Sequence, residues 1–282
     1  MRGVIIRRMD ALPKIGFGGM PLSIKGRPPE DVARRVLNAA IDAGMTLIDT
    51  ADVYCLDDDD IGHNERLIAS IGQRDKIRVA TKGGLARPGG AWVNAGNPQQ
   101  IRAACERSLR ALQTERIWLY QFHAPDLKVP FEKSIEAFAE LHREGKFEHF
   151  GLSNVSIEQL DRAARILPVA SVQNRLSPYA RESVPIAQEC ARRNILFLAY
   201  SPLGGSRLAK KLHELAPLRR IAETRGISVQ QVAIAWTRAQ AATVVPIPGA
   251  RSVEHAVDCA QAAGLDLTSD ELNLLYSSRG GI

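Results

Sequence analysis

The chain has 282 residues, a formal net charge of +6, 45% hydrophobic residues and 24% charged residues, which is an ordinary balance for a globular protein with a large core. Lysine and arginine are spread along the chain without a long basic block, so the charge does not indicate a nucleic-acid partner. No apolar stretch approaches the ~20 residues of a membrane span, and the charged N-terminal segment is too short for a secretory signal.

The cysteines indicate a reducing environment. There are four of them, far apart and without a C-x-x-C pair: Cys55, Cys105, Cys190 and Cys259. We therefore expect neither a disulfide framework nor a zinc or other metal site, and we expect the protein to be cytoplasmic.

Short β-branched runs alternate with amphipathic stretches along the whole chain. In chain order, the expected strands are Lys14–Phe17, Thr46–Thr50, Ile77–Lys82, Ile117–His123, His149–Ser153, Ser171–Arg175, Ile195–Tyr200 and Thr243–Ile247. The expected helices are 30–44, 64–72, 98–112, 131–144, 156–166, 182–193, 228–240 and 252–262. Eight strands, each followed by a helix, predict a (β/α)8 TIM barrel, and the length fits one barrel domain over residues 1–282.

Several residues mark where these helices begin and end. Pro98 opens one helix, and Ser156 and Ser252 are expected N-caps. Gly44 and Gly145 follow the last turns of two others, as C-terminal glycines do.

The alternative α/β arrangement is an open, doubly wound sheet. That fold usually carries a G-x-G-x-x-G turn after its first strand, and the glycines at 16–19 do not complete this pattern. The glycine-rich segment 83–96 is interpreted as an ordinary long βα loop. The Lys/Arg-rich segment 207–225 has uncertain helicity.

Polar side chains stand at the ends of three consecutive predicted strands. The second, third and fourth strands end with Asp49, Lys82 and His123, and Tyr54 follows Asp49 in the next loop. Because catalytic groups of such a barrel lie where strands end and βα loops begin, we expect these four side chains to meet.

Together these residues predict proton transfer to a carbonyl. A lysine at the mouth of the barrel needs a carboxylate partner, for which Asp49 stands on the neighbouring strand. A nearby ammonium lowers the pKa of a tyrosine. Tyr54 is then expected to be the general acid for a carbonyl oxygen whose carbon receives hydride, with His123 orienting that oxygen. Taken singly, each residue is more often structural, and Lys82 alone also permits a Schiff-base aldolase.

The motifs that contain these residues resemble those of the aldo-keto reductase family over nearly the whole chain. The matching segments are Gly16–Met20, Leu47–Tyr54, Asn64-Glu65, Ala80–Gly83, Leu119–His123, Gly151–Asn154, Val172–Asn174, Ala199–Gly204 and Pro246–Gly249. The resemblance implies a barrel that reduces an aldehyde or ketone with a nicotinamide cofactor. It assigns the family's acid, lysine, aspartate and histidine to Tyr54, Lys82, Asp49 and His123.

The same resemblance implies a cofactor site. The corresponding positions are Ser153, Asn154 and Gln173 for the nicotinamide amide, Tyr200 for ring stacking, and Ser201, Leu203 and Gly205 for the pyrophosphate. Stacking and amide contacts together fix which face of the nicotinamide delivers hydride. For the Ser153-Asn154 pair, a helix cap is the structural alternative.

The expected phosphate-binding positions depart from the family pattern. Many relatives have a Lys-Ser pair after the eighth strand and an arginine six residues beyond it, where this chain has Gly249-Ala250 and His255. Arg251 remains as a guanidinium suited to a 2′-phosphate, and His255 would add a donor. We therefore expect NADPH as the cofactor and keep NADH as the alternative.

Further features bear on the substrate. Met20 and Trp92 are expected to line the pocket, with ordinary packing as the alternative. The segment after Leu267 is short, which indicates an open site for a small-molecule carbonyl substrate. The acidic run Asp57–Asp60 is interpreted as a solvated loop, with a metal site or a rim that disfavours anionic substrates as alternatives.

A second possible function belongs to a different class. Some members of the family are regulatory β-subunits of potassium channels, in which a bound cofactor reports redox state to a partner. Nothing in this chain resembles an added interaction segment, so the reductase is favoured. We expect a monomer or a weak oligomer, without nucleic-acid or membrane partners.

Overall fold

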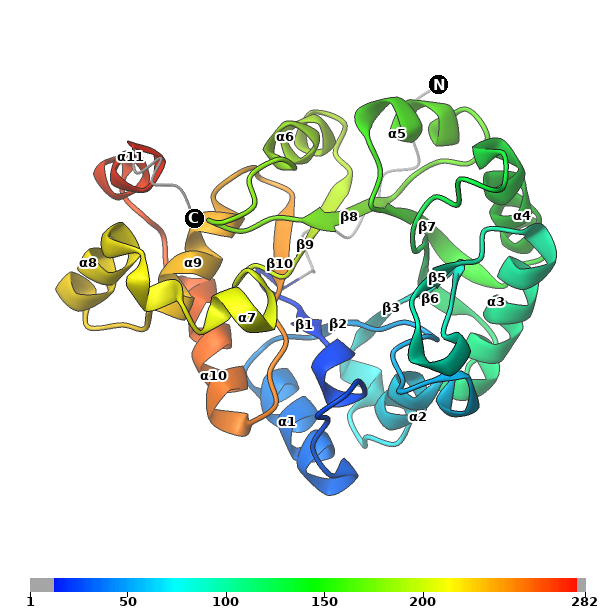
Figure 1. The fold of residues 1–282 in the computed structure, drawn as a ribbon, viewed down its shortest axis with the longest axis horizontal. Coiled ribbons are helices and arrows are strands. Elements are labelled where there is room, and N and C mark those ends of the chain that lie inside the picture. Colours follow the sequence, from blue (N-terminus) through cyan, green and yellow to red (C-terminus); the bar gives the residue numbers. More distant parts are fainter. Residues whose placement is uncertain (1–12, 278–282) are drawn as a thin grey trace.

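The computed structural model describes residues 13–277, in which eight parallel strands form one sheet. In sheet order they are β1 (Phe17–Gly18), β2 (Leu47–Asp49), β3 (Arg78–Gly83), β6 (Ile117–Phe122), β7 (Phe147–Ser153), β8 (Ser171–Arg175), β9 (Leu196–Tyr200) and β10 (Val244–Ile247). The backbone N–H groups of Gly16 and Gly18 donate to the carbonyls of Pro246 and Pro248, both at 2.9 Å. These bonds bring the first strand beside the last, and the sheet becomes a nearly closed barrel (Figure 1). The predicted (β/α)8 fold is confirmed.

Helices surround the ring of strands (Figure 1). The α-helices are α1 (Glu30–Asp42), α2 (His63–Ala69), α3 (Pro98–Leu112), α4 (Phe131–Arg143), α5 (Ile157–Ala164), α6 (Val184–Arg192), α7 (Gly205–Ala209), α8 (Ala216–Arg225), α9 (Val229–Arg238), α10 (Val253–Gln261) and α11 (Ser269–Ser277). Short 3-10 turns include η2 (Met20–Leu22), η3 (Asp58–Asp60) and η5 (Pro88–Gly90). No helix in the described part of the chain is long and apolar enough to cross a membrane.

The predicted helix ends agree with the structure. Ser156 accepts a hydrogen bond from the backbone of Gln159 in a complete capping box, and the Ser252 side chain caps α10 by accepting from the backbone N–H of His255. Gly44 and Gly145 follow α1 and α4 with φ of +94° and +75°, a conformation that costs glycine least. These local signals fix the direction in which the chain leaves each helix.

The barrel interior is an apolar layer with polar side chains above it. The apolar side chains are Leu47, Ala80, Leu119, Leu196, Leu198, Val245 and Ile247. Two residues further along β2, β3 and β6 stand Asp49, Lys82 and Gln121, all buried and on the same face because strand side chains alternate. Val79, on the other face of β3, packs against the larger core beneath the helices. The polar groups therefore collect at the carboxyl end of the barrel.

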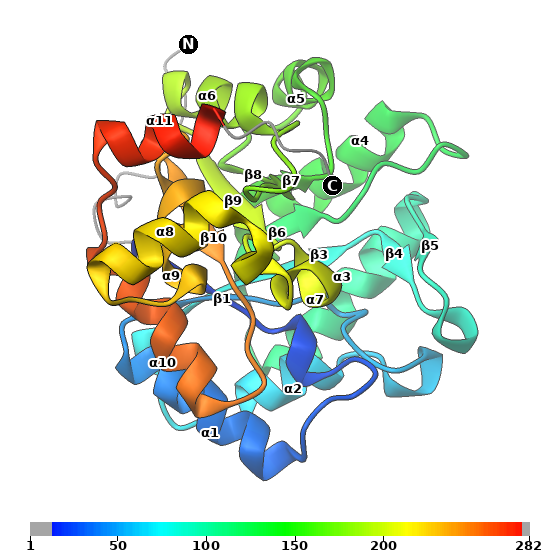
Figure 2. The same ribbon diagram turned by 60° about the vertical axis from the view of Figure 1, so that its left-hand side comes forward.

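Two segments differ from their sequence interpretation. Residues 83–96 contain a small hairpin, β4 (Leu85–Ala86) paired with β5 (Val93–Asn94), which projects from the edge of the barrel in Figure 2. Strands of two residues carry no periodic signal, so the hairpin was not predictable. The segment of uncertain helicity, 207–225, contains the end of α7 and all of α8.

Candidate active site

The predicted acid, lysine and aspartate lie together at the carboxyl ends of β2 and β3. Lys82 Nζ is 2.7 Å from Asp49 Oδ2, 2.8 Å from the carbonyl oxygen of Thr50 and 2.9 Å from the Tyr54 hydroxyl. All four residues are buried. The neighbouring parallel strands place Lys82 and Asp49 within reach of each other, because Asp49 stands opposite Ala80 in the register. The predicted ion pair is therefore present, and it is buried.

The bond between Lys82 and Tyr54 has only one possible direction. An ammonium has three N–H donors and no acceptor, so Lys82 donates to the tyrosine oxygen. Its other donors are directed to Asp49 and to the carbonyl of Thr50. The phenolic hydrogen of Tyr54 is consequently available to a different acceptor, such as an oxygen placed next to the ring.

The expectation that Lys82 lowers the pKa of Tyr54 is wrong. Burial raises the pKa of Tyr54 well above its ordinary value, and the Asp49 carboxylate raises it further. Burial also lowers the pKa of Lys82, while Asp49 opposes that fall. Desolvation dominates at this position, so Tyr54 keeps its phenolic proton.

His123 lies beside Tyr54 as a neutral imidazole. The two ring centroids are 5.9 Å apart with an interplanar angle of 79°. Burial lowers the pKa of His123 well below its ordinary value, and the charge of Lys82 adds to the effect. Its buried Nδ1 has no hydrogen-bond partner among residues 13–277. A neutral imidazole offers one donor and one acceptor, which suits hydrogen bonding to a polar ligand atom.

Residues expected to hold a nicotinamide amide are gathered by β7 and the turn that follows it. Asn154 adopts the left-handed conformation with φ of +58°. Its Nδ2 donates to the carbonyl of His123 at 2.9 Å and to Ser153 Oγ at 3.1 Å, and its Oδ1 accepts from the Tyr200 hydroxyl at 2.8 Å. Three of the predicted cofactor residues therefore contact one another beside His123.

Gln173 connects this group to the ion pair. It lies opposite Ser153 in the parallel register of β7 and β8. Its Nε2 donates to Asp49 Oδ1 at 2.7 Å, the carboxylate oxygen that Lys82 does not use. The neighbouring Gln121 is buried, and its Nε2 has no hydrogen-bond partner within the described residues. An amide ligand would find both donors and acceptors at this place.

The predicted pyrophosphate residues form one turn after β9. Ser201, Gly204 and Gly205 have φ of +51°, +84° and +81°. A Cβ on Gly205 would meet no heavy atom within 4 Å, so the backbone there faces open space. Leu203 packs against the main core and holds the turn beside Tyr200. Such a glycine-rich turn lets a ligand approach the backbone closely.

The expected phosphate-binding residues lie at the start of α10. Arg251 is exposed, and its guanidinium donates to the carbonyls of Pro21 and Lys25, both at 3.1 Å. His255 is exposed one turn further on. A Cβ on Gly249 would lie 2.7 Å from the carbonyl oxygen of Gly18, so β1 approaches too closely for a side chain at this position in the present backbone.

Both predicted pocket residues lie beside Tyr54. Met20, in η2, packs against the small cluster of Ala51, Val53 and Tyr54. The Trp92 ring meets the Tyr54 ring edge to face, with centroids 6.3 Å apart. Trp92 is 48% exposed, so its indole is open to a ligand.

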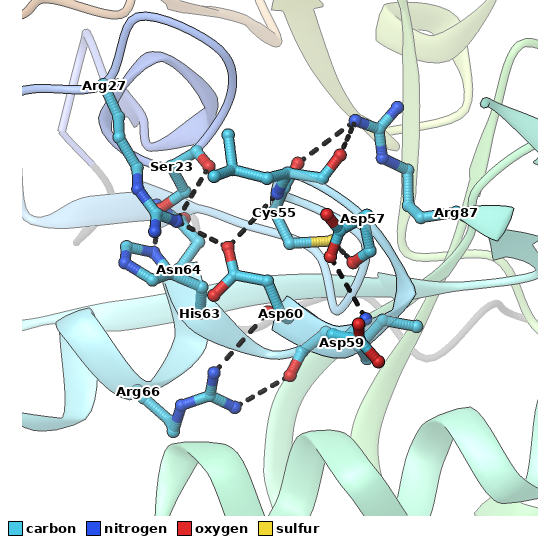
Figure 3. A network of polar contacts seen from close by, with 12 residues as sticks. Ser23, Arg27, Cys55, Asp57, Asp59, Asp60, His63, Asn64, Arg66 and Arg87 are labelled. Carbon is cyan, nitrogen blue, oxygen red and sulfur yellow. Dashed lines mark hydrogen bonds and ion pairs between the residues drawn. The ribbon is translucent and has the colours of Figure 1, made fainter. Parts of the chain in front are cut away.

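Several aspartates of the acidic run have defined partners (Figure 3). Asp57 caps η3 by accepting from the backbone of Asp59 at 3.2 Å, and Asp60 pairs with Arg27 at 2.5 Å. The run is therefore an ordered turn on the surface, in which Asp58 and Asp59 are exposed to solvent. Within residues 13–277, no three His, Cys, Asp or Glu side chains are grouped so that they could hold a metal ion.

Two buried carboxyl groups behind Lys82 were missed from the sequence. Glu65 Oε1 accepts from Thr81 Oγ1 at 2.6 Å, and burial raises the pKa of Glu65 to about 7. Burial, with Glu65 adding to it, raises the pKa of Asp52 to about 8. When ionised, both carboxyl groups favour the charged form of Lys82. The sequence held only one indication of this buried group. Side chains alternate along β3, so Thr81, which binds Glu65, points to the opposite face from Lys82.

Known proteins resemble this chain in fold and in part of the sequence. Residues 14–279 match the model of the aldo/keto reductase family. An uncharacterized oxidoreductase of Schizosaccharomyces pombe is 30% identical over 262 residues, which cover 91% of this chain and 83% of that protein.

Solved structures give the same result. A glycerol dehydrogenase of Gluconobacter oxydans superposes with a TM-score of 0.82 at 28% identity, covering 94% of this chain and 91% of the other. An aldo/keto reductase of Klebsiella pneumoniae, in complex with NADP and acetate, superposes with a TM-score of 0.78 at 28% identity and the same coverage. The barrel, the buried Lys82–Asp49 pair and the family match together show that the chain belongs to the aldo/keto reductase family.

Proposed function

We propose that the protein reduces an aldehyde or ketone to an alcohol by hydride transfer from NADPH, with Tyr54 as the general acid. The observation that carries this proposal is the hydrogen bond of 2.9 Å from Lys82 Nζ to the Tyr54 hydroxyl. Lysine can only donate in that bond, so the bond leaves the tyrosine proton available to a carbonyl oxygen.

Each of the four residues has one task in this reaction. Tyr54 donates its proton to the carbonyl oxygen as hydride reaches the carbonyl carbon. Lys82 stabilises the negative charge that develops on the tyrosine oxygen, and it does so without reorganising because three acceptors already hold it. Asp49 keeps Lys82 charged. His123, neutral because burial lowers its pKa, positions the carbonyl oxygen by a hydrogen bond.

The residues beside this group fit a nicotinamide cofactor, which supplies the hydride when it is bound. The buried Gln121 Nε2 lacks a partner among the described residues, and it lies next to Gln173, with 3.4 Å between the two side chains. Tyr200 and Asn154 would hold the ring, and the turn 201–205 would follow the diphosphate. The NADP-bound relative of Klebsiella pneumoniae and the exposed guanidinium of Arg251 favour NADPH over NADH.

A carbonyl screen tests this proposal. The purified protein would be mixed with aliphatic aldehydes, aromatic aldehydes and ketones, each with NADPH and with NADH, and cofactor oxidation would be followed. We expect turnover of at least one carbonyl class, faster with NADPH. Cofactor binding without turnover on any carbonyl would favour the redox-sensing alternative. Borohydride trapping of a substrate on Lys82 would instead identify a Schiff-base enzyme.

A further inference from the structure

Arg87 is a buried guanidinium beside the site, and it has no task in the proposed proton transfer. Its Nη2 donates to the carbonyl oxygens of Cys55 and Leu56 at 3.1 and 2.9 Å (Figure 3). These are the first two residues after Tyr54. Arg87 therefore attaches the loop that follows β3 to the loop that carries the proposed acid.

The same guanidinium stacks on Trp92. Arg87 Cζ lies 4.0 Å from the centroid of the indole. Its Nε and Nη1 are buried and have no hydrogen-bond partner among residues 13–277, which is explained if these donors lie over the electron-rich face of the ring. Arg87 thus lies between Trp92 and the backbone that follows Tyr54, and it contacts both.

A second link joins the same two loops. The backbone N–H of Gly89 donates to Asp58 Oδ1 at 3.0 Å. Gly90 approaches so closely that a Cβ on it would lie 3.0 Å from the carbonyl oxygen of Leu56. The acidic loop is itself attached to the segment after β1 by the ion pair between Asp60 and Arg27. These links fix the indole relative to Tyr54.

We propose that Arg87 is a positioning residue that sets the substrate preference of the proposed reductase. It holds the Trp92 indole as a fixed apolar wall beside Tyr54, so carbonyl compounds with an aryl group or a long alkyl chain are preferred over small ones. The exposed part of the indole would contact that group. Val93 and Leu56, which neighbour Trp92 and Cys55 in the chain, are also large exposed apolar residues and extend the apolar surface. This inference rests on the proposed function.

Two matched aldehydes test the inference. Propanal and 3-phenylpropanal share the reacting group and differ by a phenyl ring, so the ratio of their kcat/KM values with NADPH reports recognition of the ring. Trp92→Ala and Arg87→Lys are each expected to lower the ratio of 3-phenylpropanal to propanal roughly five- to tenfold, the value of one aromatic contact. The loss of kcat/KM for 3-phenylpropanal should appear as a higher KM for this aldehyde. Trp92→Phe, which keeps an aromatic wall, should retain most of the ratio.

The control is Arg102→Lys, because Arg102 pairs with Glu144 on the surface, and this variant should leave the ratio unchanged. An unchanged ratio of kcat/KM values in Arg87→Lys would overturn the role of Arg87 while leaving the reductase in place. This outcome includes an equal loss of kcat/KM with both aldehydes. No turnover of any carbonyl in the screen by the unsubstituted protein, in a preparation that binds NADPH, would overturn the reductase and this inference together. Turnover of other carbonyls without turnover of 3-phenylpropanal would overturn this inference alone.

A measurement without turnover checks the same contact. Trp92 fluorescence, obtained as the difference from Trp92→Phe, should be quenched more strongly by acrylamide in Arg87→Lys than in the unsubstituted protein, because the guanidinium no longer covers the ring. Equal quenching in both proteins would also contradict the inference.

Discussion

Replacing Asp49 by asparagine would separate the charge of the buried pair from its shape. Lys82 would keep its place but lose a carboxylate at 2.7 Å, and Gln173 Nε2 would lose a charged acceptor at the same distance. Because both partners of the ion pair are buried, removing one charge is expected to cost about 3–5 kcal/mol of unfolding free energy. The pKa of Lys82, already lowered by burial, would fall further. The lysine would then be neutral when the tyrosine oxygen becomes negative, and kcat should fall at least about 10²-fold.

Urea unfolding at neutral pH and steady-state kinetics with a carbonyl substrate measure these two effects. The control is the double variant Asp49→Leu/Lys82→Met, which removes both charges. It should be more stable than Asp49→Leu alone, because no uncompensated ion remains, yet it should be inactive. An Asp49→Asn protein within about 1 kcal/mol of the original and with unreduced kcat would refute the reasoning.

Three further substitutions test other parts of the structure. Burial raises the pKa of Glu65 to about 7 and that of Asp52 to about 8. Between the ordinary pKa values of these groups and the raised ones, the folded chain binds more protons than the unfolded chain. The free energy of unfolding therefore falls as pH rises through that window. Glu65→Gln should flatten the dependence of unfolding free energy on pH, whereas the same change at the exposed Glu115 should not. Arg251→Ala should weaken NADPH binding roughly tenfold and NADH binding little, as measured by cofactor fluorescence titration; equal losses would show that the 2′-phosphate is held elsewhere. Gly249→Ala would place a Cβ 2.7 Å from the carbonyl oxygen of Gly18 and should cost about 1–3 kcal/mol in thermal unfolding, while Gly72→Ala, which meets nothing within 4 Å, should be neutral.

The strands and most helices were predictable because burial leaves a pattern in the sequence. The strand predicted at Ser171–Arg175 has the same bounds in the structure, and Ser156 caps its helix as expected. The hairpin β4–β5 was not predictable because two-residue strands have no period and its residues are exposed or half-buried. In α8, Leu218, Ile221 and Ala222 are buried at helical spacing, but the surrounding basic residues obscured that pattern.

The sequence located the candidate site better than it described its electrostatics. Strand ends indicated that Asp49, Lys82 and His123 would meet Tyr54, because parallel strands finish at one edge of a barrel. The pKa of Tyr54 was expected to fall, since spacing shows which charge is near but not how much water is excluded. Arg87 was missed for a related reason: its stack on Trp92 depends on the path of a loop that has no sequence period.

The most direct test of the central claim is the turnover of Tyr54→Phe. Phenylalanine keeps the ring that packs against His123 and Trp92 and removes only the hydroxyl that Lys82 contacts. Single-turnover reduction of a carbonyl with NADPH should slow at least about 10²-fold, while the Kd for NADPH, measured in the same preparation, should stay nearly the same. Unreduced turnover in this variant would contradict the assignment of Tyr54 as the proton donor.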